Sequence, residues 1–281
     1  MSWHQLGAVD PAELTATRLE LHHAAQAVAA VGATLLEPQP DDSHPNLGWN
    51  EALQAFVGRA APGGARAALR AADLELRLLG ADFAPLATRA LAGATLDDAH
   101  EWLAKALAAA GVDVPASGLR RTGYEIPDHP VAAGAPFSAP GAAHAELARW
   151  FANGQSALSE AAVVAEGASE LRIWPHHFDL GTLVTLATNA DGSLARSIGL
   201  GLSPGDESYP EPYFYVSPWP YPDEALLPGL GAGGSWHTAG FTSAVFGAEE
   251  LLAGPPEQQE QRVRAFIAEA TAASRKALPA G

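Results

Sequence analysis

The pattern of apolar and polar positions predicts a helix close to the start of the chain. Asp10, Pro11 and Glu13 are typical of a helix start, because a carboxylate caps the first turn and proline needs no amide partner there. The apolar spacing that follows predicts a helix from about Pro11 to Val31 that stops near Gly32. Its expected core positions are Leu14, Leu21, Ala25 and Val28.

The first half of the chain continues with extended segments and a second helix. Residues 49–57 and 68–79 are rich in alternating apolar positions, so each is predicted to form a strand. The run from Thr95 to Asp98 is typical of a helix cap, and the helix that it begins is expected to extend to Ala110 and end at Gly111.

Residues 122–140 separate two halves of the chain. They are rich in Pro and Gly and have no apolar period, which is typical of a linker or a covering loop. The sequence therefore predicts an N-terminal half, 1–121, and a C-terminal half, 141–281, which can also close into one compact domain.

The second half repeats the order of the first. A helix is predicted at about 141–166, and a last helix follows Pro255, Pro256 and Glu257. Between them lie four predicted strands, 171–174, 180–188, 195–202 and 213–216. A hairpin turn is expected at Asn189–Gly192, and regular structure is expected to end at Pro218. Two halves of the order helix, strands, helix predict an α+β fold with a mainly antiparallel sheet packed against helices.

Composition narrows the function classes. The formal charge of -16 opposes binding to phosphate backbones and anionic lipid, so we expect no nucleic acid and no membrane as partner. The absence of Cys excludes thiolate nucleophiles and thiolate metal sites. No stretch approaches the roughly 18 apolar residues of a membrane span, and the start of the chain lacks a signal pattern. A soluble cytoplasmic protein that binds a small molecule is expected, with no prediction of its oligomeric state.

Three residues form a candidate metal site. In an extended segment His177 and Asp179 share a face, and a later His237 completes the two-histidine, one-carboxylate set that holds Fe, Zn or Mn. The next basic residue after His237 is Arg262. No Arg or Lys close to His237 in the sequence can therefore bind the carboxylate of an oxo acid, which argues against an Fe(II)/2-oxoglutarate enzyme. The alternative is that Asp179 caps a turn or pairs with Arg172 while the histidines bind backbone.

Further polar residues are candidates for catalysis. Glu207 lies on a loop that follows a predicted strand and is expected to ligate the metal or act as a base, with Glu211 as second choice. The alternative for this loop, above all for Asp206, is a solvated acidic turn. His176 points away from the expected metal set and is a further catalytic candidate.

Aromatic and helix residues complete the expected site. Tyr213, Tyr215 and Trp219, with neighbouring Tyr209 and Tyr221, suit a wall for an organic ligand, and core packing is the alternative. On the first helix Arg18, His22 and Gln26 form one polar line, for which a surface stripe is the alternative. The polar segment 37–46, which contains His44, can fold over the same place. We expect His22 as a catalytic residue, and Gln26 and His44 as substrate-binding residues.

Several segments resemble those of an uncharacterised family of soluble bacterial proteins. More distantly they are similar to another domain family of unknown function, in which Asp179 is shared. The resemblance implies no particular activity. The segments are 21–26, 171–179, 205–222 and 236–241.

The candidate residues support three hypotheses of different class. The first is a metal-dependent hydrolase or oxygenase that acts on a small organic molecule through the His, Asp and Glu site. The second is a non-catalytic protein that binds a small molecule through the same groups without a metal. The third is a structural protein whose Tyr-Pro segment meets a partner.

Overall fold

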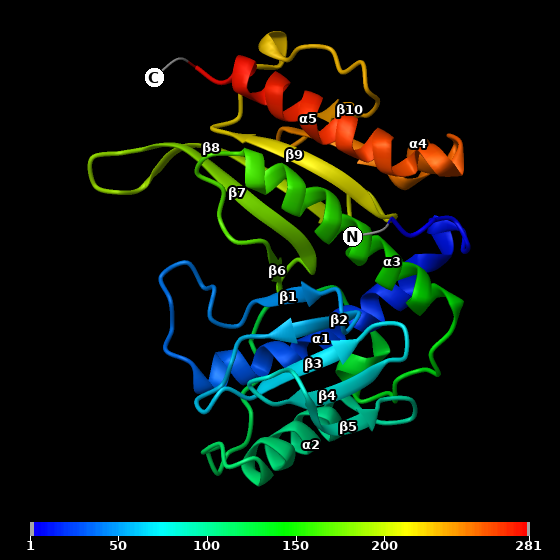
Figure 1. Ribbon diagram of the computed structural model, residues 1–281, viewed down its shortest axis with the longest axis vertical. Helices are drawn as coiled ribbons and strands as arrows, with labels where there is room; N and C mark the ends of the chain where they lie inside the picture. The colour runs from blue at the N-terminus through cyan, green and yellow to red at the C-terminus, as the bar shows by residue number, and fades with distance from the viewer. Residues whose placement is uncertain (1–2, 280–281) are drawn as a thin grey trace. The chain divides into compact units, whose positions relative to one another are not determined.

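The computed structural model describes residues 3–279 as an α+β fold (Figure 1). In this part of the chain there are five α-helices and eleven strands that pair antiparallel with their neighbours. The predicted α+β class with a mainly antiparallel sheet is confirmed, although the sequence predicted fewer helices and strands. The chain forms two compact units. The N-terminal unit contains residues 13–148 and 173–178, and the C-terminal unit contains the residues up to 12, 149–172 and those from 179 onward. No helix within residues 3–279 is long and apolar enough to cross a membrane.

The first helix is the centre of the N-terminal unit. A 3-10 turn, η1 (Pro11–Leu14), leads into α1 (Thr15–Leu35), and the Asp10 carboxylate accepts a hydrogen bond from the Ala12 amide at 3.0 Å. The helix is buried along most of its length, which includes polar residues as well as apolar ones. The four expected core positions, Leu14, Leu21, Ala25 and Val28, are all buried.

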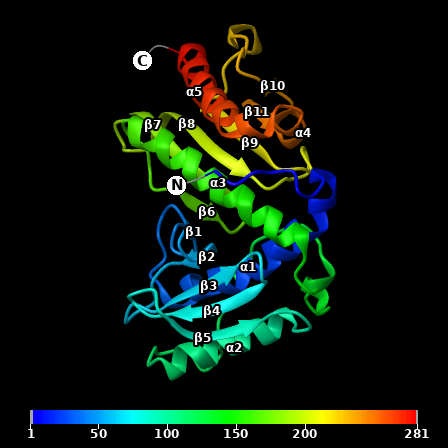
Figure 2. The ribbon, with the colours of Figure 1, turned by 45° about the vertical axis from the view of Figure 1, so that its right-hand side comes forward.

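The strands of the N-terminal unit form an antiparallel meander of hairpins (Figure 2). It contains β1 (Leu47–Asn50), β2 (Ala55–Gly58), β3 (Arg66–Arg70), β4 (Glu75–Leu79) and β5 (Pro85–Ala90). A later strand, β6 (Arg172–Trp174), joins it through Ile173 opposite Leu47.

Each of the two strands predicted in this half is in fact two strands joined by a tight turn. The turns place Gln54 and Leu74 at φ values of 49° and 48°, a region that non-glycine residues seldom adopt. No Gly or Pro marks either turn and apolar residues continue through them, so the signal of the reversal is weak and consists of Asn50 and Asp73.

The second helix of the N-terminal unit, α2 (Leu96–Ala109), forms as predicted. Thr95 and Asp98 make a reciprocal capping box, and Gly111 at φ 82° follows the helix end. The helix packs against α1 and β4. Residues 122–140, expected as a linker or covering loop, belong to this unit and include a short 3-10 turn, η2 (Pro130–Ala133).

Contacts of three residues hold the segment from 122 to 144 onto α1. The Ser138 amide and hydroxyl each donate to the Glu20 carboxylate at 2.7 Å, and the His144 Nε2 lies 3.3 Å from the same carboxylate. The Thr122 hydroxyl donates to the Gln26 amide oxygen at 2.7 Å. The segment is therefore a fixed wall of the N-terminal unit.

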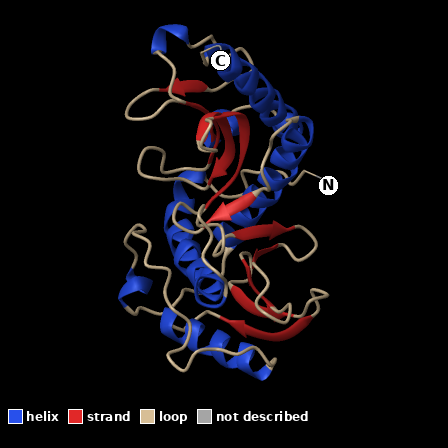
Figure 3. Cartoon of the chain, turned by 90° about the vertical axis from the view of Figure 1, so that its left-hand side faces the viewer, coloured by secondary structure: helices blue, strands red, loops and turns tan. Residues whose placement is uncertain are grey.

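The strands of the C-terminal unit follow one another in the order β10-β11-β9-β8-β7. Its strands are β7 (Asp179–Thr188), β8 (Leu194–Ser203), β9 (Tyr213–Trp219), β10 (Ser235–His237) and β11 (Ser243–Gly247). The helices of the second half are α3 (Ala142–Val164), α4 (Ala248–Leu252) and α5 (Gln259–Ala277), with 3-10 turns η3 (Glu224–Leu226) and η4 (Pro256–Gln258). In Figure 3 the strands and the helices form separate layers.

Strand β9 continues past the point where proline was expected to end it. Pro218 stands opposite Ile198 of β8, but the ladder with β11 reaches only Val216 opposite Ala244. Beyond Val216 the strand therefore has a neighbour on one side only, where a residue without an amide hydrogen is tolerated. The predicted hairpin turn at Asn189–Gly192 is present, with the Asn189 amide bonded to the Ser193 carbonyl at 2.8 Å.

Candidate functional site

The polar line of α1 faces a turn that lies far away in the sequence. The Nε2 atoms of His22 and Gln26 each lie 2.7 Å from the carbonyl oxygen of Pro175, in the turn that follows β6. A carbonyl only accepts, so both nitrogens donate, and His22 carries its hydrogen on Nε2. Arg18, His22 and Gln26 are all buried, so the line is no surface stripe.

The ring of His22 is held in a dry environment. It stacks on buried Phe178 with centroids 5.2 Å apart and an interplanar angle of 8°, and Phe178 in turn meets Phe56 edge-on. Burial lowers the pKa of His22 from its ordinary 6.5 to about 4, although the bond to the Pro175 carbonyl acts in the opposite direction. At neutral pH the ring is therefore uncharged, with a lone pair on Nδ1.

The residues from Trp174 to Phe178 form a tight turn instead of an extended segment. The amides of His177 and Phe178 both donate to the Trp174 carbonyl, at 3.2 and 2.6 Å, and Phe178 has a φ of 59°. The alternation that was to place His177 and Asp179 on one face is therefore broken. His177 is exposed, and the ring of His176 lies between that of His177 at 4.4 Å and that of Tyr124 at 5.5 Å.

The three expected ligands do not make a metal site. Within residues 3–279 no group of three or more His, Asp or Glu side chains is placed to hold a metal ion. His237 shows why: its Nε2 donates to the Ala239 carbonyl at 2.9 Å, and its Nδ1 accepts from the Tyr209 hydroxyl at 3.0 Å. Because both of its ring nitrogens are in hydrogen bonds, His237 has no nitrogen left to ligate the Fe, Zn or Mn ion that was expected at His177, Asp179 and His237.

The expected aromatic residues of the C-terminal unit pair with carboxylates. The Tyr215 hydroxyl donates to Asp179 and the Tyr213 hydroxyl donates to Asp206, each at 2.5 Å. Burial first, and then the neighbouring carboxylates, raise the pKa of both phenols, so both remain neutral donors. Asp206, for which a solvated turn was the alternative, is thus a fixed partner, and Tyr213 and Tyr215 have side-chain partners in addition to their packing.

A glycine track explains how Tyr215 reaches Asp179. In the register of the sheet Gly181 stands opposite Gly201, and Gly201 stands opposite Tyr215. A Cβ on Gly201 would overlap the Tyr215 ring, and one on Gly181 would lie 2.9 Å from its hydroxyl. The ring therefore lies across two strands where no side chain occupies the surface, which fixes the hydroxyl on the carboxylate.

The remaining candidates of the C-terminal unit lie near the surface. Trp219 and Tyr221 are 46% and 47% exposed and meet edge-on with centroids 5.2 Å apart. Glu207 is exposed on the loop between β8 and β9. Glu211 lines an open depression of about 570 Å³ together with two further carboxylates, Asp10 and Glu249.

In the N-terminal unit, His44 lies beside other polar groups of the loop that follows α1. Its Nδ1 is 3.6 Å from Asp42, and the same aspartate accepts a hydrogen bond from the Tyr124 hydroxyl at 2.5 Å. The segment 37–46 therefore contacts the wall that contains Tyr124. Burial and the contact with Asp42 raise the pKa of that phenol.

A cavity of about 460 Å³ lies within the N-terminal unit, and sequence reasoning did not find it. It is bordered by α1, α2 and the segment 121–128. Its polar and charged lining includes His23, Gln26, His100, Tyr124, Glu125 and Asp128.

Two neutral imidazoles are the main polar groups of this cavity. The His23 Nε2 lies 2.9 Å from the Pro127 carbonyl, and the His100 Nδ1 lies 2.8 Å from the Leu96 carbonyl. Each of these nitrogens must donate, so the lone pairs are on His23 Nδ1 and His100 Nε2. Burial lowers the pKa of both rings. The buried His100 Nε2 has no hydrogen-bond partner in the described part of the chain.

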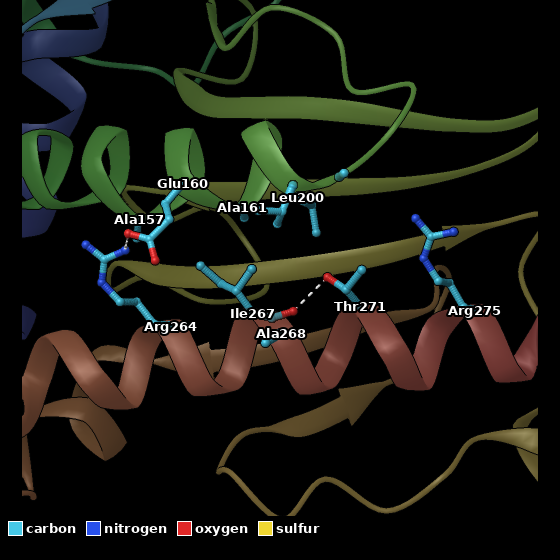
Figure 4. Close-up of a pocket in the computed structure, with 11 residues that line it drawn as sticks. Ala157, Glu160, Ala161, Leu200, Arg264, Ile267, Ala268, Thr271 and Arg275 are labelled. Carbon is cyan, nitrogen blue, oxygen red and sulfur yellow. Dashed lines mark hydrogen bonds and ion pairs between the residues drawn. The ribbon is translucent and has the colours of Figure 1, made fainter.

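A second cavity, in the C-terminal unit, offers less chemistry (Figure 4). It is a groove of about 350 Å³ between α3 and α5, with Leu200 of β8 at its floor. Arg264 forms ion pairs with Glu160 and Glu260, the Thr271 hydroxyl donates to the Ile267 carbonyl at 2.7 Å, and Arg275, the remaining charged residue of the lining, is exposed. The cavity of the N-terminal unit is therefore the better candidate, because one of its buried polar atoms still lacks a partner.

The glycine track predicts the effect of adding a methyl group. Gly201→Ala displaces the Tyr215 ring and should lower the free energy of unfolding of the C-terminal unit by about 1–3 kcal/mol. The matched control is Gly199→Ala on the same strand, where the new Cβ meets only Ser217 at 3.9 Å. Chemical denaturation and near-ultraviolet circular dichroism measure both variants. Equal losses in the two variants would show that Tyr215 does not lie on this track.

The lowered pKa of His22 predicts a stability that depends on pH. Between about pH 6.5 and 4 the unfolded chain binds a proton at His22 and the folded chain does not, so stability falls as pH falls. The loss from this residue is about 1.4 kcal/mol per pH unit in that window. His22→Gln keeps a donor for the Pro175 carbonyl and removes the titration.

Denaturation curves of both proteins from pH 7.5 to 4.5 check this prediction. At pH 7.5 the difference between the two proteins measures the loss of packing alone. Below pH 6.5 the difference in the slope of the unfolding free energy against pH measures the proton that His22 takes up on unfolding. If the slope of the His22→Gln variant equals that of the wild type, His22 has an ordinary pKa and the turn does not dehydrate it.

Comparison with known proteins finds no match among family models, curated proteins or solved structures. The family resemblance of the histidine, Tyr-Pro and Trp-His segments therefore stays a prediction. Inference on function rests on the side chains and cavities of the two units.

Proposed function

We propose that this chain binds a small organic molecule in the cavity bordered by α1, α2 and the segment 121–128. The observation that carries the proposal is the buried Nε2 of His100, which lacks a partner in the described residues and belongs to a side chain that lines the cavity. Leaving a buried polar atom unsatisfied costs about 1–3 kcal/mol, and a ligand that donates to it recovers this loss.

The size and the lining of the cavity support the same function. About 460 Å³ is within the range of sites for small molecules, and Leu96 and Ile126 supply apolar surface beside the polar groups. The pKa values of His23, His100 and Tyr124 are all shifted, and such shifts cluster at functional sites.

A metal-dependent hydrolase or oxygenase is the weaker reading. It needs a set of ligands, and the histidine expected to complete that set, His237, binds Tyr209 and Ala239 with its two ring nitrogens. The N-terminal cavity needs no metal to act, because its imidazoles recognise a ligand by hydrogen bonding.

A cavity-filling variant tests the proposal. Ala132 lines the cavity and is exposed, whereas the adjacent Ala133 does not line it. In an NMR screen with a library of small aromatic and aliphatic fragments, binders should shift the amide signals of residues 96–100 and 121–128. Ala132→Trp should abolish these shifts, while Ala133→Trp should leave them.

Two results would overturn the proposal. In the first, no fragment shifts these signals in the wild type. In the second, fragments bind the wild type and the Ala132→Trp variant equally, which would place their binding outside the cavity. Thermal unfolding of each variant shows whether the fold is retained.

A further inference from the structure

The chemistry of the cavity wall restricts the class of ligand, given the proposed function. His23 and His100 have already donated their only ring hydrogen, to the carbonyls of Pro127 and Leu96. What each ring still offers is a lone pair, so each can accept a hydrogen bond but cannot donate one. A ligand that fits both rings must therefore bring its own donors.

Three further polar side chains of the wall use their donors within the protein, whereas the Arg121 guanidinium keeps N–H groups beyond its bond to Asp97. The Gln26 amide donates to Pro175 at 2.7 Å, and the Thr122 hydroxyl donates to Gln26 at 2.7 Å. The Tyr124 hydroxyl donates to Asp42. An acceptor-only ligand such as a carboxylate would find no free donor on these three side chains and would have to bind the exposed Arg121.

The charges around the cavity favour a cation. Glu125 and Asp128 line it from the exposed side, and Arg121, the guanidinium of the lining, is paired with Asp97 at 2.6 Å. The whole chain has a formal charge of -16, and such a field attracts positive ligands. Aromatic Tyr124 and apolar Ile126 suit an organic body attached to the charge.

We propose that the ligand of this cavity is an organic amine, bound as its ammonium ion, whose N–H groups donate to His23 and His100. An ammonium group has three donors and no acceptor, which complements a wall of lone pairs and carboxylates. A divalent metal fits less well, because the described residues contain no group of three His, Asp or Glu side chains that could surround it.

A pair of probes that differ in one group tests the class of ligand. Tryptamine and tryptophol share the indole and the two-carbon chain, and differ only in having an ammonium or a hydroxyl group at the end. By isothermal titration, tryptamine should bind about tenfold or more tightly than tryptophol, since hydrogen bonds to a charged donor are the stronger ones. Indole-3-propionate, which has a carboxylate there, should not bind.

Two matched variants test whether a carboxylate of the cavity is responsible for the preference for an ammonium ligand. Glu125→Gln removes a carboxylate from the cavity and should weaken tryptamine several-fold while tryptophol is unchanged. Glu101→Gln removes an equal charge from the exposed face of α2, where Glu101 pairs with Lys105, and should change neither. In nitrogen-15 spectra of the imidazoles, tryptamine should shift the His100 Nε2 signal, which a purely structural histidine would not show.

The outcomes distinguish a failure of the proposed ligand class from a failure of the proposed function. Equal or tighter binding of tryptophol or indole-3-propionate overturns the ammonium class, as does a lack of tryptamine binding where other fragments bind; small-molecule binding then stands. An equal effect of the Glu101→Gln and Glu125→Gln substitutions overturns the role of the cavity carboxylates. If no probe or fragment shifts residues 96–100 and 121–128, the proposed function itself fails.

Discussion

The carbonyl of Pro175 is the acceptor on which the interior of the N-terminal unit depends. Helix α1 is buried along most of its length, so its polar side chains need partners inside the protein. His22 and Gln26 both donate to this single oxygen. The requirement brings residues 173–178 into the N-terminal unit, although the segments on both sides of them belong to the other one.

The hydrogen bonds that side-chain donors make within the protein also decide which groups remain available for a ligand. In the N-terminal unit His22, His23 and His100 each donate to a backbone carbonyl, so each keeps a lone pair. In the C-terminal unit Tyr213 and Tyr215 donate to carboxylates, and His237 uses both nitrogens. These three side chains of the second unit therefore have partners, whereas His100 of the first unit keeps a buried acceptor without one among the described residues.

Local signals in the sequence were sufficient for the four long helices, although not for the short α4. The Thr95 cap, the Pro11 start and the Gly111 stop act within one turn, so each can be read from neighbouring residues. The hairpins at Gln54 and Leu74 could not be read in this way, because both turns use residues with side chains at positive φ. Such turns are held by the pairing of the strands, which is not a local property.

The candidate site shows the same limit. The sequence correctly singled out His22 and Gln26 as polar groups on one line of a helix, but the extended spacing assumed for His177 and Asp179 failed at a turn with Phe178 at positive φ. His100 carried no sequence signal at all, because a lone histidine on an apolar helix face is usually a satisfied core residue. Its place in the proposed function comes from the partner that its Nε2 lacks, and only the arrangement of the surrounding elements reveals that.

A histidine whose one nitrogen donates to a backbone carbonyl is fixed in tautomer and orientation, so its other nitrogen presents a lone pair in a set direction. His100 has this arrangement in a cavity, and His237 has lost it by accepting from Tyr209. His100 is anchored to a carbonyl through Nδ1 and His237 through Nε2, and they differ in whether the remaining nitrogen has a partner. The proposed binding site therefore rests on an acceptor that the fold leaves without a partner, and not on a cluster of histidines and carboxylates in the sequence.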